Sequence, residues 1–342
     1  MPRWTVVVAA FALAWIVTPS GPVTAQERVV ELVGTIPGPA TTVHVHDGVA
    51  YVSHGAEVRL YDLNDPSTPR PLGSYTFPQN VYGVRVSNSV AYAAVDFDGL
   101  GILDVSDPSS PTLLASLETG GQALSVDIAG SVAVLANRLS GLEVIDVSDP
   151  SSPVSRGAYF TEGYATDVDA AGSIAYVVDR PGGLSIIDLR KTGEPEAEST
   201  QSMTERPASV GVTRQTEDVP GATLAGVMST DSLLELFDVS DPLAPVAVST
   251  YRDPERPPTG QNIATPRLRM EGSLAFIADA NRPFLLQVVD LSEPSRPRRI
   301  AGYETPRAPR DVSVSDSTIL VAMANDENDP DAPGVLVLRL SQ

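Results

Sequence analysis

Short apolar runs separated by turn-forming residues recur along the chain with a period of about 42 residues. In one period, strands are predicted at Leu124–Ile128, Val132–Ala136, Leu142–Val147 and Val154–Phe160, with the sequences AGS, NRLSG and SDPSSP as the connections. Several runs, such as LEVI and AYVV, are apolar at consecutive positions, which is typical of strands buried on both faces. Four short strands per period are typical of a β-propeller blade.

An aspartate that closes each predicted third strand marks the period. The chain reads LYDLNDPSTP, ILDVSDPSSP, VIDVSDPSSP, IIDLRKTGEP, LFDVSDPLAP and VVDLSEPSRP around Asp62, Asp104, Asp146, Asp188, Asp238 and Asp290, and Arg339 takes this place in a degenerate last copy. An aspartate before a Pro-bounded turn can accept a backbone N–H bond two residues further on. A calcium loop built from Asp104, Ser106 and Asp107 is the alternative. The motif recurs in most blades and lacks the full ligand spacing of such a loop, so we favour a structural turn.

The strand count predicts how the ring closes. Third strands occur seven times, whereas outer strands follow the aspartate motif only six times. The sequence VVELVGTI, Val29–Ile36, has the outer-strand pattern and precedes every first strand. We therefore predict an all-β fold in residues 26–342, a single seven-bladed β-propeller domain of four-stranded blades, in which the N-terminal strand pairs into the last blade.

The repeated pattern GLxIxDVSDPxxP, with AYV upstream as at Ala50–Val52 and Ala175–Val177, resembles the LVIVD-repeat family of secreted and surface bacterial proteins. The likeness covers essentially all of the chain after the first 25 residues and weakens at Lys191–Glu194, at Glu293 and in the last copy. It implies a β-propeller fold and a surface location, and it implies no catalytic site.

Residues 1–25 have the pattern of a secretory signal peptide. A basic start, MPR, precedes an apolar run from Trp4 to Val17, and small residues at Val23 and Ala25 predict cleavage after Ala25. The alternative is an uncleaved anchor, but the run is shorter than the ~20 residues that a spanning helix needs. We expect a secreted, periplasmic or cell-surface protein without a membrane span after cleavage.

The composition narrows the possible chemistry. The chain has no cysteine, which excludes disulfides, a lipoprotein thioether and thiolate metal sites. Both tryptophans, Trp4 and Trp15, lie in the leader, so the tryptophan-dependent Asp-box of sialidase-type propellers and the docking motif of quinoprotein propellers are missing, as are GxSxG, HExxH and P-loop motifs. A formal net charge of −20 makes nucleic acid an unsuitable partner.

Candidate site residues come from positions where the first strands of the blades differ. One aligned column holds His44, Arg85, Asp127, Asp169, Gly211, Arg269 and Ser313, and the column two residues earlier holds Thr42, Gly83, Ser125, Asp167, Ser209, Arg267 and Asp311. First strands line the channel of a propeller, and variation between similar blades is expected at a unique site. We therefore predict a binding site at the channel rim, formed by His44, Arg85, Asp127, Asp167, Asp169, Arg267, Arg269 and Asp311. The alternative is that arginines and aspartates simply pair across a water-filled channel.

Two histidines and three long segments are further candidates for metal or loop-based binding. His44 and His46 share a strand face, but no third ligand is marked by spacing, so we predict no metal and no cofactor. The long segments Tyr251–Pro266 and Ala324–Gly334 are expected on the rim that surrounds the site, and Thr213–Thr223 on the opposite face. The acidic run Asp326–Asp331 could hold calcium, although such a run is usually a solvated loop.

These observations favour an exported, non-enzymatic scaffold that binds a protein or another envelope component through one rim, using the central Arg/Asp set and the long segment Tyr251–Pro266. The alternative is a hydrolase or lyase at the channel mouth. In that case Asp127, Asp167, Asp169 and His44 would be acid/base groups, and Arg267 or Arg269 would hold an anionic substrate.

Overall fold

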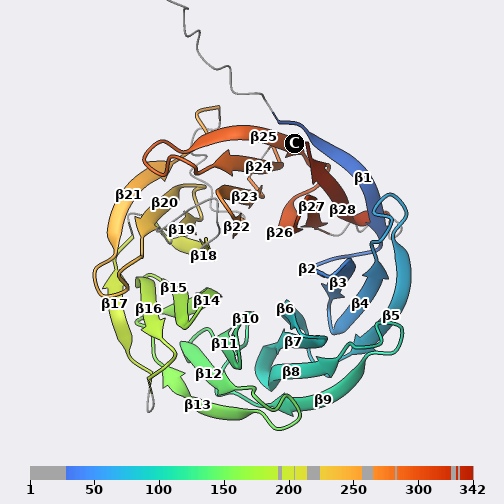
Figure 1. Cartoon of the computed structure of the whole chain (residues 1–342), viewed down its shortest axis with the longest axis horizontal. Coiled ribbons are helices and arrows are strands. Elements are labelled where there is room, and N and C mark those ends of the chain that lie inside the picture. Colours follow the sequence, from blue (N-terminus) through green and yellow to red (C-terminus); the bar gives the residue numbers. More distant parts are fainter. Residues whose placement is uncertain are drawn as a thin grey trace, which may run out of the picture.

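The repeated strand quartets form antiparallel sheets in the computed structural model, which describes residues 28–191, 195–203, 205–213, 224–255, 265–281, 283–324, 329 and 332–341. These residues form seven four-stranded sheets arranged in a ring around a central axis (Figure 1). The predicted seven-bladed β-propeller is therefore confirmed. The helical part of the described chain is a single 3₁₀ turn, Asp96–Asp98.

The strands follow one another from the channel to the outside in each blade. The first blade comprises β2 (Thr42–His46), β3 (Val49–His54), β4 (Glu57–Asp62) and β5 (Arg70–Thr76). The second comprises β6 (Val81–Ser87), β7 (Val90–Val95), β8 (Gly99–Asp104) and β9 (Thr112–Leu117). The third comprises β10 (Ser125–Ala129), β11 (Val132–Ala136), β12 (Leu142–Asp146) and β13 (Val154–Tyr159). The fourth comprises β14 (Tyr164–Ala171), β15 (Ile174–Arg180), β16 (Gly183–Asp188) and β17 (Ala197–Gln201).

The remaining blades repeat this order. The fifth comprises β18 (Pro207–Val212), β19 (Leu224–Ser229), β20 (Leu234–Asp238) and β21 (Val246–Tyr251). The sixth comprises β22 (Arg267–Glu271), β23 (Leu274–Asp279), β24 (Leu285–Asp290) and β25 (Arg298–Glu304). The seventh comprises β26 (Pro309–Ser315), β27 (Thr318–Met323), β28 (Pro333–Leu340) and β1 (Val30–Pro37).

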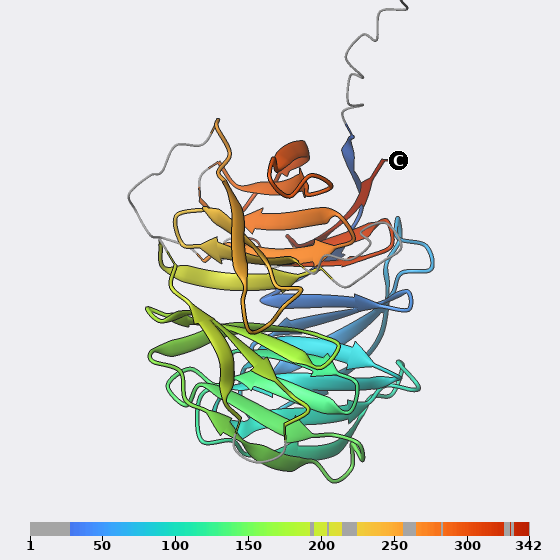
Figure 2. The same ribbon diagram turned by 60° about the vertical axis from the view of Figure 1, so that its left-hand side comes forward.

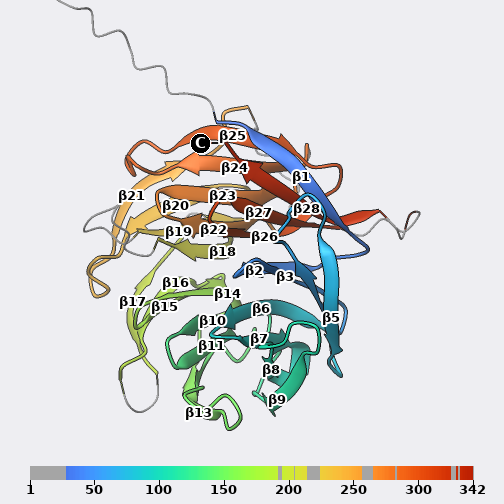
Figure 3. The ribbon, with the colours of Figure 1, turned by 45° about the vertical axis from the view of Figure 1, so that its right-hand side comes forward.

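The N-terminal strand closes the ring, as predicted. β1 pairs antiparallel with β28, from Val30 opposite Leu340 to Pro37 opposite Pro333. Figures 2 and 3 show the N-terminal strand beside the C-terminal strand. Val30 and Ile36 are buried, at 6% and 0% exposure. The two ends of the described chain therefore hold one blade together.

Adjacent blades bury both faces of each sheet against one another. One core cluster joins Phe276 and Leu286 of the sixth blade to Val312 and Leu336 of the seventh. Similar clusters join the other neighbouring pairs. This double burial explains why the strand sequences are apolar at consecutive positions instead of alternating. Among the described residues, no helix is long and apolar enough to cross a membrane.

The repeated aspartate motif is a structural turn between the third and outer strands. In the described copies the carboxylate accepts the backbone N–H two residues further on at 2.8–2.9 Å, in the pairs Asp62–Asn64, Asp104–Ser106, Asp146–Ser148, Asp188–Arg190, Asp238–Ser240 and Asp290–Ser292. Hydrogen bonds from Ser106 lower the pKa of Asp104, and hydrogen bonds from Arg156 and then Ser148 lower the pKa of Asp146. The favoured structural interpretation of the motif is confirmed by this geometry.

These turns give the protein an acid-sensitive part of its stability. Because the folded-state pKa values lie below the ordinary value of about 3.9, the stabilisation is complete above that pH and is lost as pH falls through the folded values. We expect the melting temperature of the wild-type protein to fall more steeply between about pH 4 and pH 2 than that of an Asp104→Asn/Asp146→Asn variant. Circular dichroism melting curves at each pH measure this difference. Parallel pH profiles for the two proteins would contradict the prediction.

Candidate binding site at the channel mouth

The channel opens into a cavity of about 730 Å³ at the end where the first strands begin. Its lining includes Arg85, Asp167, Arg267, Arg269 and Asp311, which are five of the predicted site residues. The other three, His44, Asp127 and Asp169, lie on the same first strands and are buried at 8%, 3% and 3% exposure. The structure therefore places the predicted set on neighbouring first strands around one channel.

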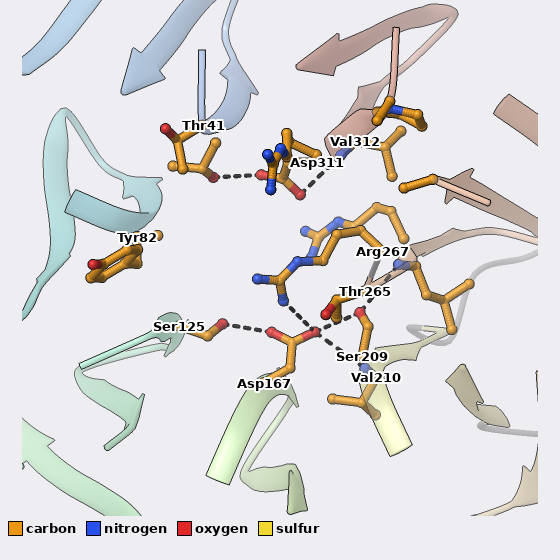
Figure 4. A pocket seen from close by; sticks show the side chains of 18 of the residues that line it. Thr41, Tyr82, Ser125, Asp167, Ser209, Val210, Thr265, Arg267, Asp311 and Val312 are labelled. Carbon is orange, nitrogen blue, oxygen red and sulfur yellow. Dashed lines mark hydrogen bonds and ion pairs between the residues drawn. The ribbon is translucent and has the colours of Figure 1, made fainter. Parts of the chain in front are cut away.

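Asp167 connects several blades at the cavity wall. Its Oδ1 accepts a hydrogen bond from Ser125 at 2.7 Å, and its Oδ2 accepts bonds from Ser209 at 2.6 Å and from the Val210 backbone N–H at 3.2 Å. Arg267 Nη1 lies 3.6 Å from Oδ2. Figure 4 shows these groups converging on the carboxylate from the third, fifth and sixth blades.

Other acceptors in the two columns bond the backbone of the next blade. Asp127 accepts the N–H of Ala170 at 2.8 Å, and Asp169 accepts the N–H of Val212 at 2.9 Å. Asp311 accepts the N–H of Val43 at 3.0 Å and also bonds the Thr42 hydroxyl. A first strand has no further strand on its channel side, so its N–H groups need acceptors from elsewhere. These side chains therefore have a structural role between blades, which the column comparison did not reveal.

Long ion pairs tie the channel arginines to these carboxylates. Arg85 Nε lies 3.4 Å from Asp127, and Arg269 Nη1 lies 3.7 Å from Asp169. The side chains of Arg85, Arg267 and Arg269 are 19%, 27% and 11% exposed. The pairing of arginine with aspartate, which we considered as an alternative to a binding site, is therefore present in the channel.

Two further arginines belong to this region and were missed from the sequence. Arg310 lines the cavity and is exposed. Its position next to Asp311 was a usable signal, but it lies outside both columns. Arg180 donates Nε–H to Pro207 O at 2.7 Å, and its pKa is lowered by burial and then by the charges of Arg267 and Arg206. Arg180 and Arg310 therefore add two guanidinium groups to the arginines and carboxylates at the channel mouth.

Two of the groups considered for acid/base or metal chemistry have clear partners in the structure. Both oxygens of Asp167 already accept hydrogen bonds, and His44 stacks on His46 with ring centroids 6.3 Å apart. No group of three or more His, Cys, Asp or Glu side chains with the geometry of a metal site occurs in this part of the chain.

The predicted rim loops fall largely outside the described residues. This applies to 256–264 of the segment Tyr251–Pro266, to 325–328, 330 and 331 of the segment Ala324–Gly334, and to 214–223 of the third insertion. The acidic run considered for calcium lies outside them too, apart from Asp329. The described ends of the third insertion, β18 and β19, confirm that it joins a first strand to a second strand.

Four large apolar side chains are exposed on the same face, in the second to fourth blades. They are Phe97, Leu139, Phe160 and Tyr164, which are 65%, 70%, 72% and 45% exposed, and we call them together the apolar rim. Three of these residues stand in connections between strands, and Tyr164 begins β14. Strand periodicity carries no information about loop residues, so sequence analysis missed the apolar rim.

Comparison with known proteins supports the fold and the repeat type. The family model described as the LVIVD repeat matches residues 79–119, 120–161, 162–191 and 265–305. The crystal structure of the Myceliophteria thermophila Cps50 (Swd1) β-propeller domain is similar with a TM-score of 0.66 and 13% identity, over 92% of this chain and 99% of that one. At this identity the likeness concerns the fold alone. No curated protein matches the chain. The four matched segments correspond to the second, third, fourth and sixth blades, and the chain therefore contains LVIVD repeats.

Proposed function

We propose that this protein is an exported, non-enzymatic binding scaffold at the cell envelope or outside the cell, and that it binds a partner protein through the apolar rim. The observation that carries the proposal is the rim itself. Phe97, Leu139, Phe160 and Tyr164 present large apolar side chains to solvent from three neighbouring blades. Large apolar side chains that are exposed together on one face of a soluble protein are typical of interaction sites.

Polar side chains next to the rim residues contact one another. Gln122 donates to Asp96 at 2.9 Å, and Arg138 donates to the Gln122 side chain at 2.6 Å. The Arg138 guanidinium lies 5.7 Å from the centre of the Tyr164 ring. These contacts link the connections of the second, third and fourth blades. A preorganised surface loses less conformational entropy when it binds.

Charge indicates the kind of protein that fits. Asp98 follows Phe97 in the chain, and Glu162 lies between Phe160 and Tyr164. The chain as a whole carries a formal net charge of −20. The complementary surface has apolar side chains flanked by lysine or arginine. A second copy of this acidic chain would be repelled by the negative charge.

Two other observations support the rest of the proposal. The carboxylates that an enzyme would use at the channel mouth accept backbone N–H bonds between blades, which suits a structural role. The leader-like composition of residues 1–25 supports export.

Photo-crosslinking tests the proposal. A crosslinking residue at Leu139 of residues 26–342 should capture a protein from the envelope fraction of the producing cell, and the purified partner should bind the wild-type protein directly. Leu139→Asp and Phe160→Asp should each raise its Kd about tenfold or more, since both residues would lie in the contact area. Leu243→Asp is the matched control, because Leu243 is 66% exposed and lies in a third-to-outer-strand turn on the opposite face. Equal losses in Leu139→Asp and Leu243→Asp, or no direct binding, would contradict the proposal.

A further inference from the structure

The cavity at the channel mouth has the size and enclosure of a small-molecule site. Its volume of about 730 Å³ falls within the range of roughly 300–1,000 Å³ that ligand pockets occupy. Among the described residues, its lining includes four arginines, Arg85, Arg267, Arg269 and Arg310, and two carboxylates, Asp167 and Asp311. Tyr82 and Phe284 add aromatic surface to the wall.

The guanidinium groups keep donors available to a ligand. An arginine carries five N–H donors. In the described part of the chain, Arg267 and Arg269 make only ion pairs of 3.6 and 3.7 Å with Asp167 and Asp169, which are longer than a hydrogen bond. Arg85 donates to the adjacent Val84 carbonyl at 3.0 Å and lies 3.4 Å from Asp127. Most of the N–H groups on these three side chains are therefore not used by the described protein atoms.

The nearby carboxylates accept hydrogen bonds from other donors. Asp167 accepts bonds from Ser125, Ser209 and Val210, and Asp311 accepts bonds from Thr42 and Val43. These neighbours draw on the same lone pairs that a close arginine–carboxylate pair would use. Arg267 and Arg269 consequently keep N–H donors that these carboxylates do not take up at hydrogen-bond distance, and the charges of Arg180 and Arg267 lie close enough to interact.

Two of the arginines are placed to act together. Arg267 and Arg269 are alternate residues of β22, so both side chains leave the same face of one strand. Their partners, Asp167 and Asp169, are alternate residues of β14. Figure 4 shows Arg267 extending into the space between Asp167 and Asp311. Paired guanidiniums at the wall of a partly enclosed cavity suit the planar or tetrahedral oxygen arrays of an oxyanion.

We infer that the channel cavity is a binding site for a small organic anion, held through a carboxylate or phosphate group by Arg267 and Arg269 and completed by Arg85 and Arg310. The aromatic rings of Tyr82 and Phe284 contact the uncharged part of the ligand. This site is separate from the apolar rim and does not depend on a protein partner. Its ligand enters from the same face, where the cavity opens.

Isothermal titration calorimetry of residues 26–342 tests the inference with three probes. Citrate supplies carboxylates, inorganic phosphate supplies the other oxyanion, and glucose is an uncharged control. We expect citrate, phosphate or both to bind and glucose not to bind, and the probe that binds identifies the oxyanion. Binding should weaken as sodium chloride rises, because salt screens the charges. No heat from either anion at concentrations up to about 10 mM, or equal binding of glucose, would overturn the inference.

Variants of the arginines separate a built site from general charge. Arg267→Ala/Arg269→Ala should raise the Kd about a hundredfold or more, because each charged hydrogen bond contributes about tenfold or more. Arg267→Lys/Arg269→Lys keeps the charge but loses the planar fork, so part of the affinity should return. Arg156→Ala is the control, since Arg156 of β13 pairs with Asp146 at the end of β12, beside the third-to-outer-strand turn on the opposite face. Unchanged affinity in the double alanine variant, with a normal circular dichroism spectrum, would overturn the inference.

The apolar rim provides the second control. Leu139→Asp should leave anion binding unchanged, and Arg267→Ala/Arg269→Ala should leave capture at the rim unchanged. Failure of one site therefore does not imply failure of the other.

Discussion

Deletion of residues 27–37 should destabilise the entire ring. We expect the melting temperature to fall by roughly 20 °C or folding to fail, because the lost free energy of unfolding approaches the total stability of about 5–15 kcal/mol of ordinary domains. The deletion removes the partner of β28 along the whole pairing from Val30 to Pro37. It also removes Val30 and Ile36 from two core clusters that join the seventh blade to its neighbours. Each blade is supported from both sides, so one open blade exposes its neighbours as well.

Point variants make this test independent of whether the deleted protein folds. Ile36→Ser should lower the melting temperature by several degrees, because burying an isoleucine contributes about 1.5–3 kcal/mol and Ile36 is 0% exposed. Leu32→Ser lies on the same strand at 47% exposure and should have little effect. Thermal unfolding followed by circular dichroism measures all three proteins. An unchanged melting temperature after deletion would refute the closure argument.

The architecture could be predicted because the same strand pattern recurs in each blade. The strand predicted at Val132–Ala136 coincides with β11, and the outer strand predicted at Val29–Ile36 overlaps β1. Each blade repeats the same strand pattern, and the aspartate turn sets how the copies are aligned with one another. The missing outer strand could then be found by counting.

The candidate site could be predicted only in part. Alignment of first strands brought Arg267 and Asp167 into one set, because equivalent positions in a ring face the same axis. It could not show that Asp167 accepts the Val210 N–H, since that bond depends on the rotation between two blades. Arg310 and the apolar rim were missed because they lie at positions where the repeat pattern does not determine the residue type. Residues that differ between copies therefore include both structural acceptors and possible binding groups.

Asp167→Ala should cost about 3–5 kcal/mol of folding stability, a fall of roughly 5–8 °C in melting temperature for a domain of this length, because it removes a buried acceptor shared by several donors. Ser125, Ser209 and the Val210 N–H lose their partner at once. Asp167→Asn keeps one acceptor oxygen, so it should cost about half as much. Urea unfolding of the three proteins gives these differences directly.

Arg267→Ala is the matched control that separates the two roles at this site. The ion pair of Arg267 with Asp167 spans 3.6 Å at a side chain that is 27% exposed, so its loss should change stability by less than about 1 kcal/mol. Equal destabilisation by Asp167→Ala and Arg267→Ala would show that the ion pair, and not the contacts between blades, holds the channel wall. With the expected difference, the aspartates stabilise the ring, and the arginines beside them are free to be substituted without unfolding it. That separation allows a repeat protein to vary its channel chemistry from blade to blade while keeping one fold.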